Sequence, residues 1–113
     1  MKRGMIPPNG PLIEAVARRF RVLGEPQRLR LLQNLETGQK SVNELAALVG
    51  ANQPNVSRHL QALFAAGLVA RRRTGATVTY SVADPVVFRL CELVCANVVE
   101  RARAVGKELG IRS

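Results

Sequence analysis

Two short helical segments joined by a three-residue link place the strongest constraint on the fold of this chain. Ser41-Val42-Asn43-Glu44 has the pattern of a capping box, in which the first and last residues each satisfy a backbone amide at the start of a helix. We predict that this helix covers residues 44–49, and that a second helix, capped by Asn52, covers residues 53–66. The link Gly50-Ala51-Asn52 has the length of the connection in a helix-turn-helix motif.

Helical and extended patterns surround this motif. Apolar spacing and Gly and Pro boundaries predict three further helices, and the pattern after Gly67 predicts a β-hairpin. Asp84-Pro85 predicts the N-cap and first residue of the last helix. We therefore expect a mostly α-helical fold with a small β-hairpin, in one domain over residues 11–105 between flexible tails at 1–10 and 106–113. The helices are predicted over 11–23, 26–35 and 86–105, and the hairpin strands over 68–73 and 78–82 around the turn 74–77.

The charge of the chain indicates its class of partner. Lys and Arg outnumber Asp and Glu by 17 to 8, and the net charge of +9 is typical of proteins that bind nucleic acid or an anionic membrane. Aromatic residues make up 4% of the chain and Trp is absent, which disfavours stacking on single-stranded bases. No segment resembles a membrane span or a signal peptide, so we expect a cytoplasmic protein without a membrane partner.

The helix predicted over residues 53–66 has two chemically different faces. Its apolar stripe is expected to face the core, and it consists of Val56, Leu60, Leu63 and Phe64. Small or hydrogen-bonding side chains without an acid occupy the outer face, as suits a helix that enters the major groove of double-stranded DNA. An ordinary solvated helix would have a similar composition, but the short capped helix before it favours DNA recognition. The predicted DNA-binding residues of this helix are Gln53, Asn55, Ser57, Arg58, His59 and Gln61.

The hairpin and His59 add to this prediction. Arg71, Arg72 and Arg73 stand beside a Gly-containing tip, where they can straddle a phosphate backbone or enter a minor groove. Such a cluster can also serve solubility or protect an edge strand from pairing. His59 lies at the edge of the apolar stripe, and packing or a phosphate contact is a better interpretation than a ligand or pH-switch role.

Three segments of the motif region resemble the ArsR/SmtB family of bacterial winged-helix repressors. They are residues 41–46, residues 53–60 and residues 66–69, and the run Ser57-Arg58-His59-Leu60 is the most specific. Residues 23–32 are similar to the helix that precedes the motif in that family, and the resemblance extends over about residues 12–100. It implies a winged helix-turn-helix fold, a homodimer joined by the first and last helices, and a palindromic operator. It also implies release of DNA when an inducer, often a metal ion, binds.

Neither familiar metal site of the resembled family is complete in this chain. The arsenic and cadmium sensors place a thiol pair at the start of the first motif helix, and the zinc sensors place four ligands on the last helices. The hydroxyl and amide side chains at the first site are not soft-metal ligands, and two carboxylates without the imidazoles are a poor zinc site. We therefore expect no required cofactor and no zinc site. The matching residues are Ser41 and Asn43 for the first site, and Asp84, Val86, Asn97 and Glu100 for the second.

Cys91 and Cys95 lie one helical turn apart on the last predicted helix, on an apolar face expected at the dimer interface. Buried cysteines usually pack as small hydrophobes, and this interpretation is favoured. The alternative is a sensor in which the two thiols hold a soft metal or metalloid, or react with an oxidant. A disulfide within the turn would distort the helix, because the Cβ atoms of such a pair lie ~5–6 Å apart. The apolar neighbours on this face are Val87, Leu90, Val94, Val98 and Val99.

Two other functions compete with an operator-binding repressor. The same fold can act as a scaffold that binds a protein partner and has no operator of its own. A small enzyme is the second alternative, but the sequence shows no carboxylate pair, nucleophile–base set or phosphate-binding glycine loop. We therefore predict a transcriptional repressor and not an enzyme.

Overall fold

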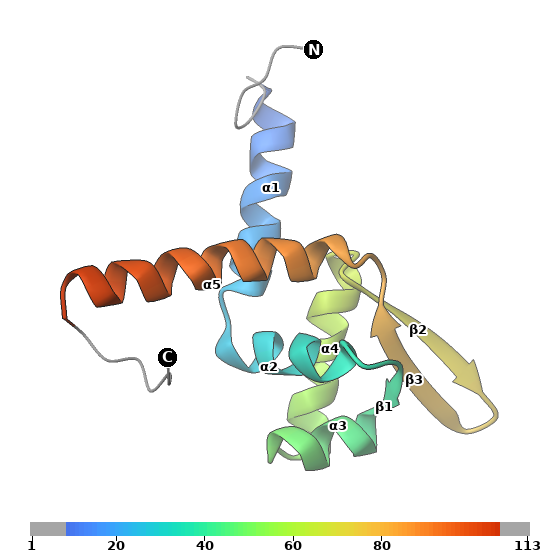
Figure 1. Ribbon diagram of the computed structural model, residues 1–113. Coiled ribbons are helices and arrows are strands. Elements are labelled where there is room, and N and C mark those ends of the chain that lie inside the picture. Colours follow the sequence, from blue (N-terminus) through green and yellow to red (C-terminus); the bar gives the residue numbers. More distant parts are fainter. Residues whose placement is uncertain (1–8, 107–113) are drawn as a thin grey trace. The chain divides into compact units, whose positions relative to one another are not determined.

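The computed structural model describes residues 9–106, which form five helices and three strands (Figure 1). Its elements are α1 (Gly10–Leu23), α2 (Pro26–Leu35), β1 (Lys40–Ser41), α3 (Val42–Val49), α4 (Gln53–Ala65), β2 (Val69–Thr74), β3 (Thr77–Val82) and α5 (Val86–Ala104). The chain divides after Ala83 into two compact units, the first with α1 to β3 and the second with α5. Within the described residues the predicted order of helices and hairpin is correct, and β1 is an addition. Most of the two predicted tails, residues 1–8 and 107–113, lies outside the described residues.

Side-chain caps fix where the helices of the first unit begin. The predicted capping box is present, because Ser41 N donates to Glu44 Oε1 at 2.8 Å and Glu44 N donates to Ser41 Oγ at 3.1 Å. The hydrogen bond from the Ser41 backbone amide, with a smaller contribution from the Ser41 side chain, holds the pKa of the Glu44 carboxyl below its ordinary value. Asn52 Oδ1 accepts from the backbone amide three residues later at 2.9 Å, which caps α4. The first helix starts earlier than predicted because Asn9 Oδ1 caps it by accepting from Leu12 N at 3.0 Å.

The last helix starts where its predicted range 86–105 starts, although Pro85 is not its first residue. Pro85, expected as its first residue, precedes it with φ −63° and ψ −9°, and the helix starts at Val86. Asp84 nevertheless stabilises this end, because its Oδ1 accepts from Val86 N at 2.9 Å. The expected contribution of Asp84 is therefore present, although Pro85 and not Asp84 occupies the N-cap position.

Two glycines adopt the positive φ that their turns require. Gly50 ends α3 with φ +67°, which allows the chain to leave the helix and enter the short link to α4. Gly75 has φ +63° as the first residue of the two-residue loop between β2 and β3, as expected for a type II′ turn. The hairpin turn is therefore shorter than the four residues predicted, since Thr74 and Thr77 are already paired across the strands.

The sheet is antiparallel, with strand order β1-β3-β2. The long strands pair in register from Val69 opposite Val82 to Thr74 opposite Thr77. The two-residue strand β1 pairs with the other edge of β3, where Lys40 lies opposite Tyr80. This pairing fixes the start of α3 beside the base of the hairpin.

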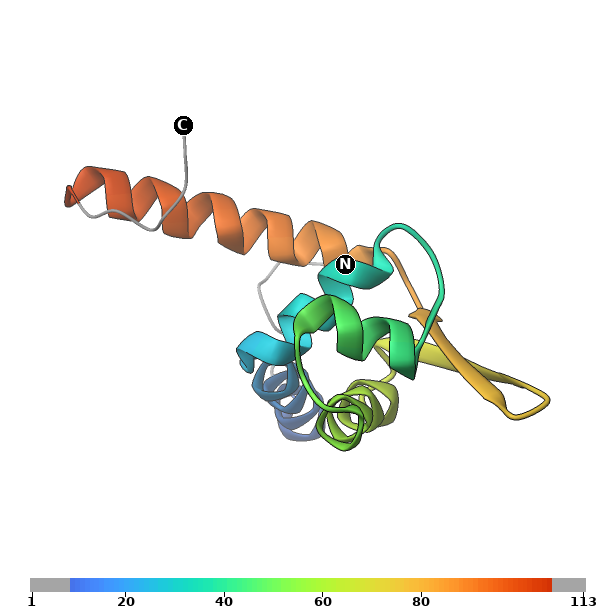
Figure 2. The same ribbon diagram turned by 90° about the horizontal axis from the view of Figure 1, so that it is seen from below.

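Leucine and valine side chains of α2, α3, α4 and β2 form the core of the first unit, closed by Tyr80 of β3. Figure 2 shows α3 and α4 packed next to each other, with the hairpin beyond α4. No helix within residues 9–106 has both the length and the apolar character needed to cross a membrane. With Leu68, which directly precedes β2, the buried residues of this core are Leu31, Leu32, Leu35, Leu45, Val56, Leu60, Leu63, Leu68, Val69 and Tyr80.

Candidate nucleic-acid interface

The buried face of α4 agrees with the prediction except at one residue. Val56, Leu60 and Leu63 are 0% exposed, so they anchor α4 in the core. Phe64, predicted in the same stripe, is 38% exposed and does not belong to the core. The guanidinium carbon of Arg71 lies 4.1 Å from the centroid of the Phe64 ring, within the range of a cation–π interaction. Phe64 thus supports the hairpin instead of the helix core.

The predicted outer face of α4 is accessible. Gln53, Arg58 and Gln61 are exposed, and Asn55 and Ser57 are half-buried. The Arg58 guanidinium donates to Asn55 Oδ1 on the preceding turn, so the two side chains lie together on the surface. This face therefore carries hydrogen-bond donors and acceptors and one guanidinium, the groups that read base edges in a major groove.

His59 differs from the other predicted DNA-binding residues, because its side chain is only 6% exposed. Its Nδ1 accepts from Arg28 Nε of α2 at 3.1 Å, and Arg28 Nη1 donates to the Val22 carbonyl at the end of α1 at 3.3 Å. Burial, together with the positive charges of Arg28 and Arg58, holds the pKa of His59 below its ordinary value. The structure places His59 in the packing between α2 and α4, and a contact of its side chain with DNA stays a prediction.

The three arginines of the hairpin separate onto the two faces of β2, because successive strand residues point to opposite sides. Arg71 and Arg73 line a groove that β2 forms with α4, whereas Arg72 does not line it. The backbone carbonyl of Arg72 accepts from the Thr79 hydroxyl at 3.4 Å. The predicted cluster is thus a pair of groove arginines and a third arginine between them.

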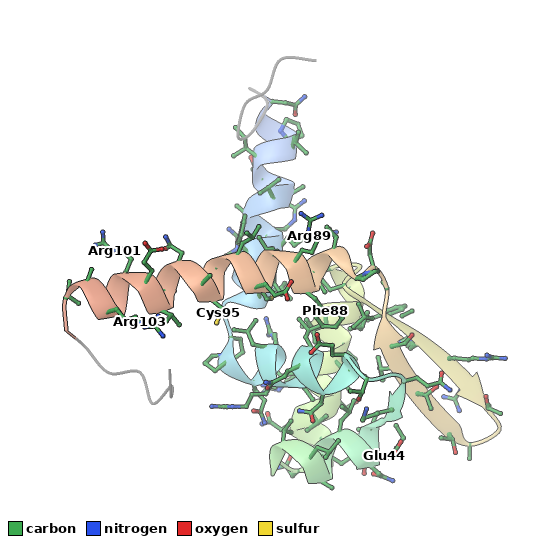
Figure 3. All side chains as sticks on the ribbon, viewed as in Figure 1. Glu44, Phe88, Arg89, Cys95, Arg101 and Arg103 are labelled. Carbon is green, nitrogen blue, oxygen red and sulfur yellow. The ribbon has the colours of Figure 1, made fainter. Side chains whose placement is uncertain are left out.

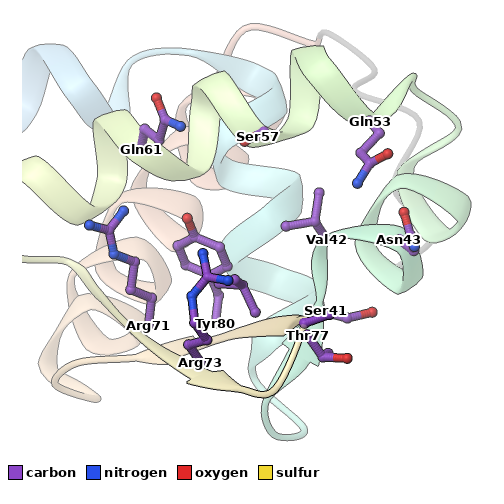
Figure 4. Close-up of a pocket in the computed structure, with 12 residues that line it drawn as sticks. Ser41, Val42, Asn43, Gln53, Ser57, Gln61, Arg71, Arg73, Thr77 and Tyr80 are labelled. Carbon is purple, nitrogen blue, oxygen red and sulfur yellow. The ribbon is translucent and has the colours of Figure 1, made fainter.

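The groove between α4 and the hairpin has a volume of about 830 Å³ and contains no acidic residue (Figure 4). In Figure 4, Gln53, Ser57 and Gln61 follow one another along α4, and Arg71 and Arg73 rise from β2 below them. Polar side chains and two guanidinium groups in a concave surface suit a phosphate backbone. The full lining is Ser41, Val42, Asn43, Gln53, Ser57, Gln61, Arg71, Arg73, Ala76, Thr77, Val78 and Tyr80.

Sequence reasoning missed the end of this groove formed by Ser41, Val42 and Asn43. These residues reach it because β1 pairs with β3 and so places the start of α3 beside the hairpin. A two-residue strand leaves no period in the sequence, so only the capping box marked this position. Ser41 and Asn43, which match thiol positions in the resembled arsenic and cadmium sensors, are therefore part of the groove.

The two cysteines lie on α5, in the second unit, and Figure 3 shows Cys95 on this helix. Cys91 is half-buried and Cys95 is exposed, and both are thiols without a disulfide. Burial raises the pKa of the Cys91 thiol above its ordinary value. Within residues 9–106, no cluster of three or more His, Cys, Asp or Glu side chains could hold a metal ion.

Comparisons with known proteins agree with this architecture. A sequence model of the bacterial regulatory protein arsR family matches residues 25–71, from the start of α2 to β2. A Streptomyces lividans protein named "Probable mercury resistance operon repressor" is 39% identical over 92 residues, which cover 81% of this chain and 74% of the relative.

Two solved structures have a fold similar to that of this chain. The homodimeric winged helix-turn-helix DNA-binding domain of Mb0332 from Mycobacterium bovis is 35% identical, with a TM-score of 0.72 over 89% of this chain and 92% of that domain. The antimony-specific transcriptional repressor AntR is 33% identical, with a TM-score of 0.74 over 91% of this chain and 92% of AntR. The predicted winged helix-turn-helix architecture is confirmed.

Proposed function

Since this chain belongs to the ArsR family of bacterial winged helix-turn-helix regulators, we propose that it represses transcription by binding a palindromic operator as a homodimer. It is a DNA-binding transcriptional regulator and not an enzyme. Its site of action is double-stranded DNA, and we assign it to the cytoplasm on that ground.

The groove between α4 and the hairpin is the observation that carries this proposal. The exposed face of α4 enters the major groove, where Arg58 and the side-chain amides of Gln53, Asn55 and Gln61 contact base edges. Arg71 and Arg73 face α4 across the groove and contact the phosphates that border it. Ser57 is small enough to permit close approach of the backbone.

Exposed apolar side chains support the homodimer. On α1, Leu12, Ile13 and Phe20 are 40%, 45% and 53% exposed, an unfavourable arrangement for a helix of an isolated chain. On α5, Val94 and Val98 are 51% and 48% exposed. We propose that the corresponding helices of two copies cover these residues, as the homodimeric state of the Mb0332 domain suggests.

Replacement of Arg58 by alanine tests the assignment of α4. Arg58→Ala should weaken operator binding by about 1–3 kcal/mol and relax the preference at one symmetric base position. Fluorescence anisotropy with the operator and with single-base variants measures both effects. Arg30→Ala, which removes an exposed arginine of α2 outside the groove, is the control. Unchanged affinity and base preference in Arg58→Ala would exclude α4 as the reading helix.

We further propose that an inducer acts through Cys91 and Cys95 and is a soft metal, a metalloid or a sulfur oxidant. Two relatives with names that refer to mercury and antimony support this class of inducer. Two thiols one turn apart on α5 suit a soft ion, whereas two ligands do not complete a zinc site. Because burial raises the pKa of Cys91, binding of a metal there releases a proton and strengthens as the pH rises.

A double variant, Cys91→Ser with Cys95→Ser, tests the sensor assignment. The variant should dimerise and bind the operator as the parent does, but should remain bound when mercuric ion, arsenite or a persulfide donor releases the parent. Release of both proteins by the same agent would assign the thiols to packing. If no agent releases the parent, the protein is a constitutive repressor.

A further inference from the structure

A second concave surface lies on the side of α4 that faces α1 and α2. It has a volume of about 540 Å³, and its lining includes Arg18, Arg19 and Arg28. The other lining residues are alanines of α1 and α4 and Val22, and no acidic side chain is among them. We call this surface the basic cleft. Three positive charges without a carboxylate favour an anionic occupant.

Two of these arginines are held in place by hydrogen bonds to the helices around them. Arg19 Nη2 donates to the Ala66 carbonyl at the end of α4 at 2.9 Å. Arg28 bridges His59 and the Val22 carbonyl through its Nε and Nη1 atoms. An arginine has five N–H donors, so both side chains keep donors for a ligand. Their positions are therefore fixed before a ligand arrives, which lowers the entropic cost of binding.

Dimerisation through the apolar face of α1 leaves Arg18 of the basic cleft accessible. At about 100° per residue, Leu12, Ile13 and Phe20 share one face of α1, and Arg18 lies on the opposite face. Arg19 follows Leu12 by seven residues and therefore borders the apolar face. The basic cleft and the hairpin groove thus flank α4 on two sides.

We propose that the basic cleft binds phosphates of the operator backbone on the side of α4 away from the hairpin. A DNA major groove is bordered by two phosphate backbones about 12 Å apart. One of these phosphate backbones is bound by the hairpin arginines. The other is bound by Arg18, Arg19 and Arg28. This assignment makes α1 a DNA-contacting helix and rests on the proposed operator binding.

The salt dependence of operator binding tests this proposal. Each phosphate contact contributes about 0.9 to the slope of log K against log salt, and a homodimer repeats the contact twice. Arg18→Gln should therefore lower the slope by about two and weaken binding to all DNA sequences alike. Arg18 is the residue of choice because it is exposed, and the hydrogen bonds of Arg19 and Arg28 described above do not involve it. Arg18→Lys keeps the charge and should keep most of the slope.

Arg21→Gln is the matched control, since it removes the same charge from an exposed residue of α1 outside the basic cleft. It should leave the slope near that of the wild type. An unchanged slope in Arg18→Gln, or an equal loss in Arg21→Gln, would overturn the proposal while operator binding by the wild type stands. Absence of operator binding by the wild type would instead overturn the proposed function.

Discussion

His59 and Arg28 show how one pair of side chains positions the recognition helix. Because Arg28 donates to Nδ1, that nitrogen must be an acceptor, and the imidazole is neutral in the folded protein. Protonation would remove the acceptor and place a third positive charge beside Arg28 and Arg58, against a weaker opposing influence of Glu25. The burial of this pair therefore links the pH of the solution to the packing of α4.

Acid should destabilise the fold through His59. Its pKa is lowered on folding, so the unfolded chain binds more protons below the ordinary value of 6.5. The stabilising contribution is complete above that pH and is lost as the pH falls through 6.5 toward the lower pKa of the folded state. His59→Gln keeps an acceptor for Arg28 but does not titrate. Thermal unfolding between pH 8 and 5 should show a smaller decline of Tm in His59→Gln, and parallel declines would exclude His59 as the cause.

The periodicity of α4 predicted the burial of Val56, Leu60 and Leu63, but it could not predict the partner of His59. Arg28 is 31 residues away in the sequence, and their contact exists only after α2 and α4 pack together. For Phe64, the periodicity predicted a buried position that the structure does not show. Its spacing fits the apolar stripe, yet the guanidinium of Arg71 offers its ring a partner outside the core.

Among the elements, the hairpin differs most between its predicted and its observed side-chain arrangement. Its strand boundaries agree with the sequence to within one residue, but the faces on which its arginines lie do not follow from the sequence run. The run Arg71-Arg72-Arg73 predicts a single cluster, but successive residues of a strand point to opposite faces, and this separates Arg72 from the other two. The groove lies on one of the two faces of β2. It is formed together with α4 and β1, and β1 is too short to be recognised from its sequence.

This separation predicts different roles for Arg72 and Arg73. Arg73→Gln should weaken binding to all DNA sequences and lower the salt slope by about two in a homodimer, because Arg73 lines the groove. Arg72→Gln should have the smaller effect, although it removes the same charge from the same strand. Anisotropy titrations of both variants over 50–300 mM salt compare them directly. A larger loss of slope in Arg72→Gln would place the phosphate on the other face of the hairpin.

At the scale of the whole molecule, the sequence predicted a dimer from an apolar stripe on the last helix. The isolated chain leaves Val94 and Val98 of this stripe about half exposed, at 51% and 48%. Cys95, expected on the same buried seam, is exposed in the single chain. Periodicity places the stripe on one face of the helix, and the second chain that would cover it stays a prediction.

A charge placed in this stripe should separate the subunits. Val94→Glu puts a carboxylate into the proposed interface twice per dimer, where an unpaired buried charge costs about 3–5 kcal/mol. We expect monomers at micromolar concentration and weak operator binding, since one protomer contacts one half-site. Ala96→Glu adds the same charge to an exposed residue on the opposite face of α5 and is the matched control. Sedimentation velocity distinguishes the outcomes. Dimeric Val94→Glu, or a monomeric wild type, would show that α5 does not join the subunits through this face.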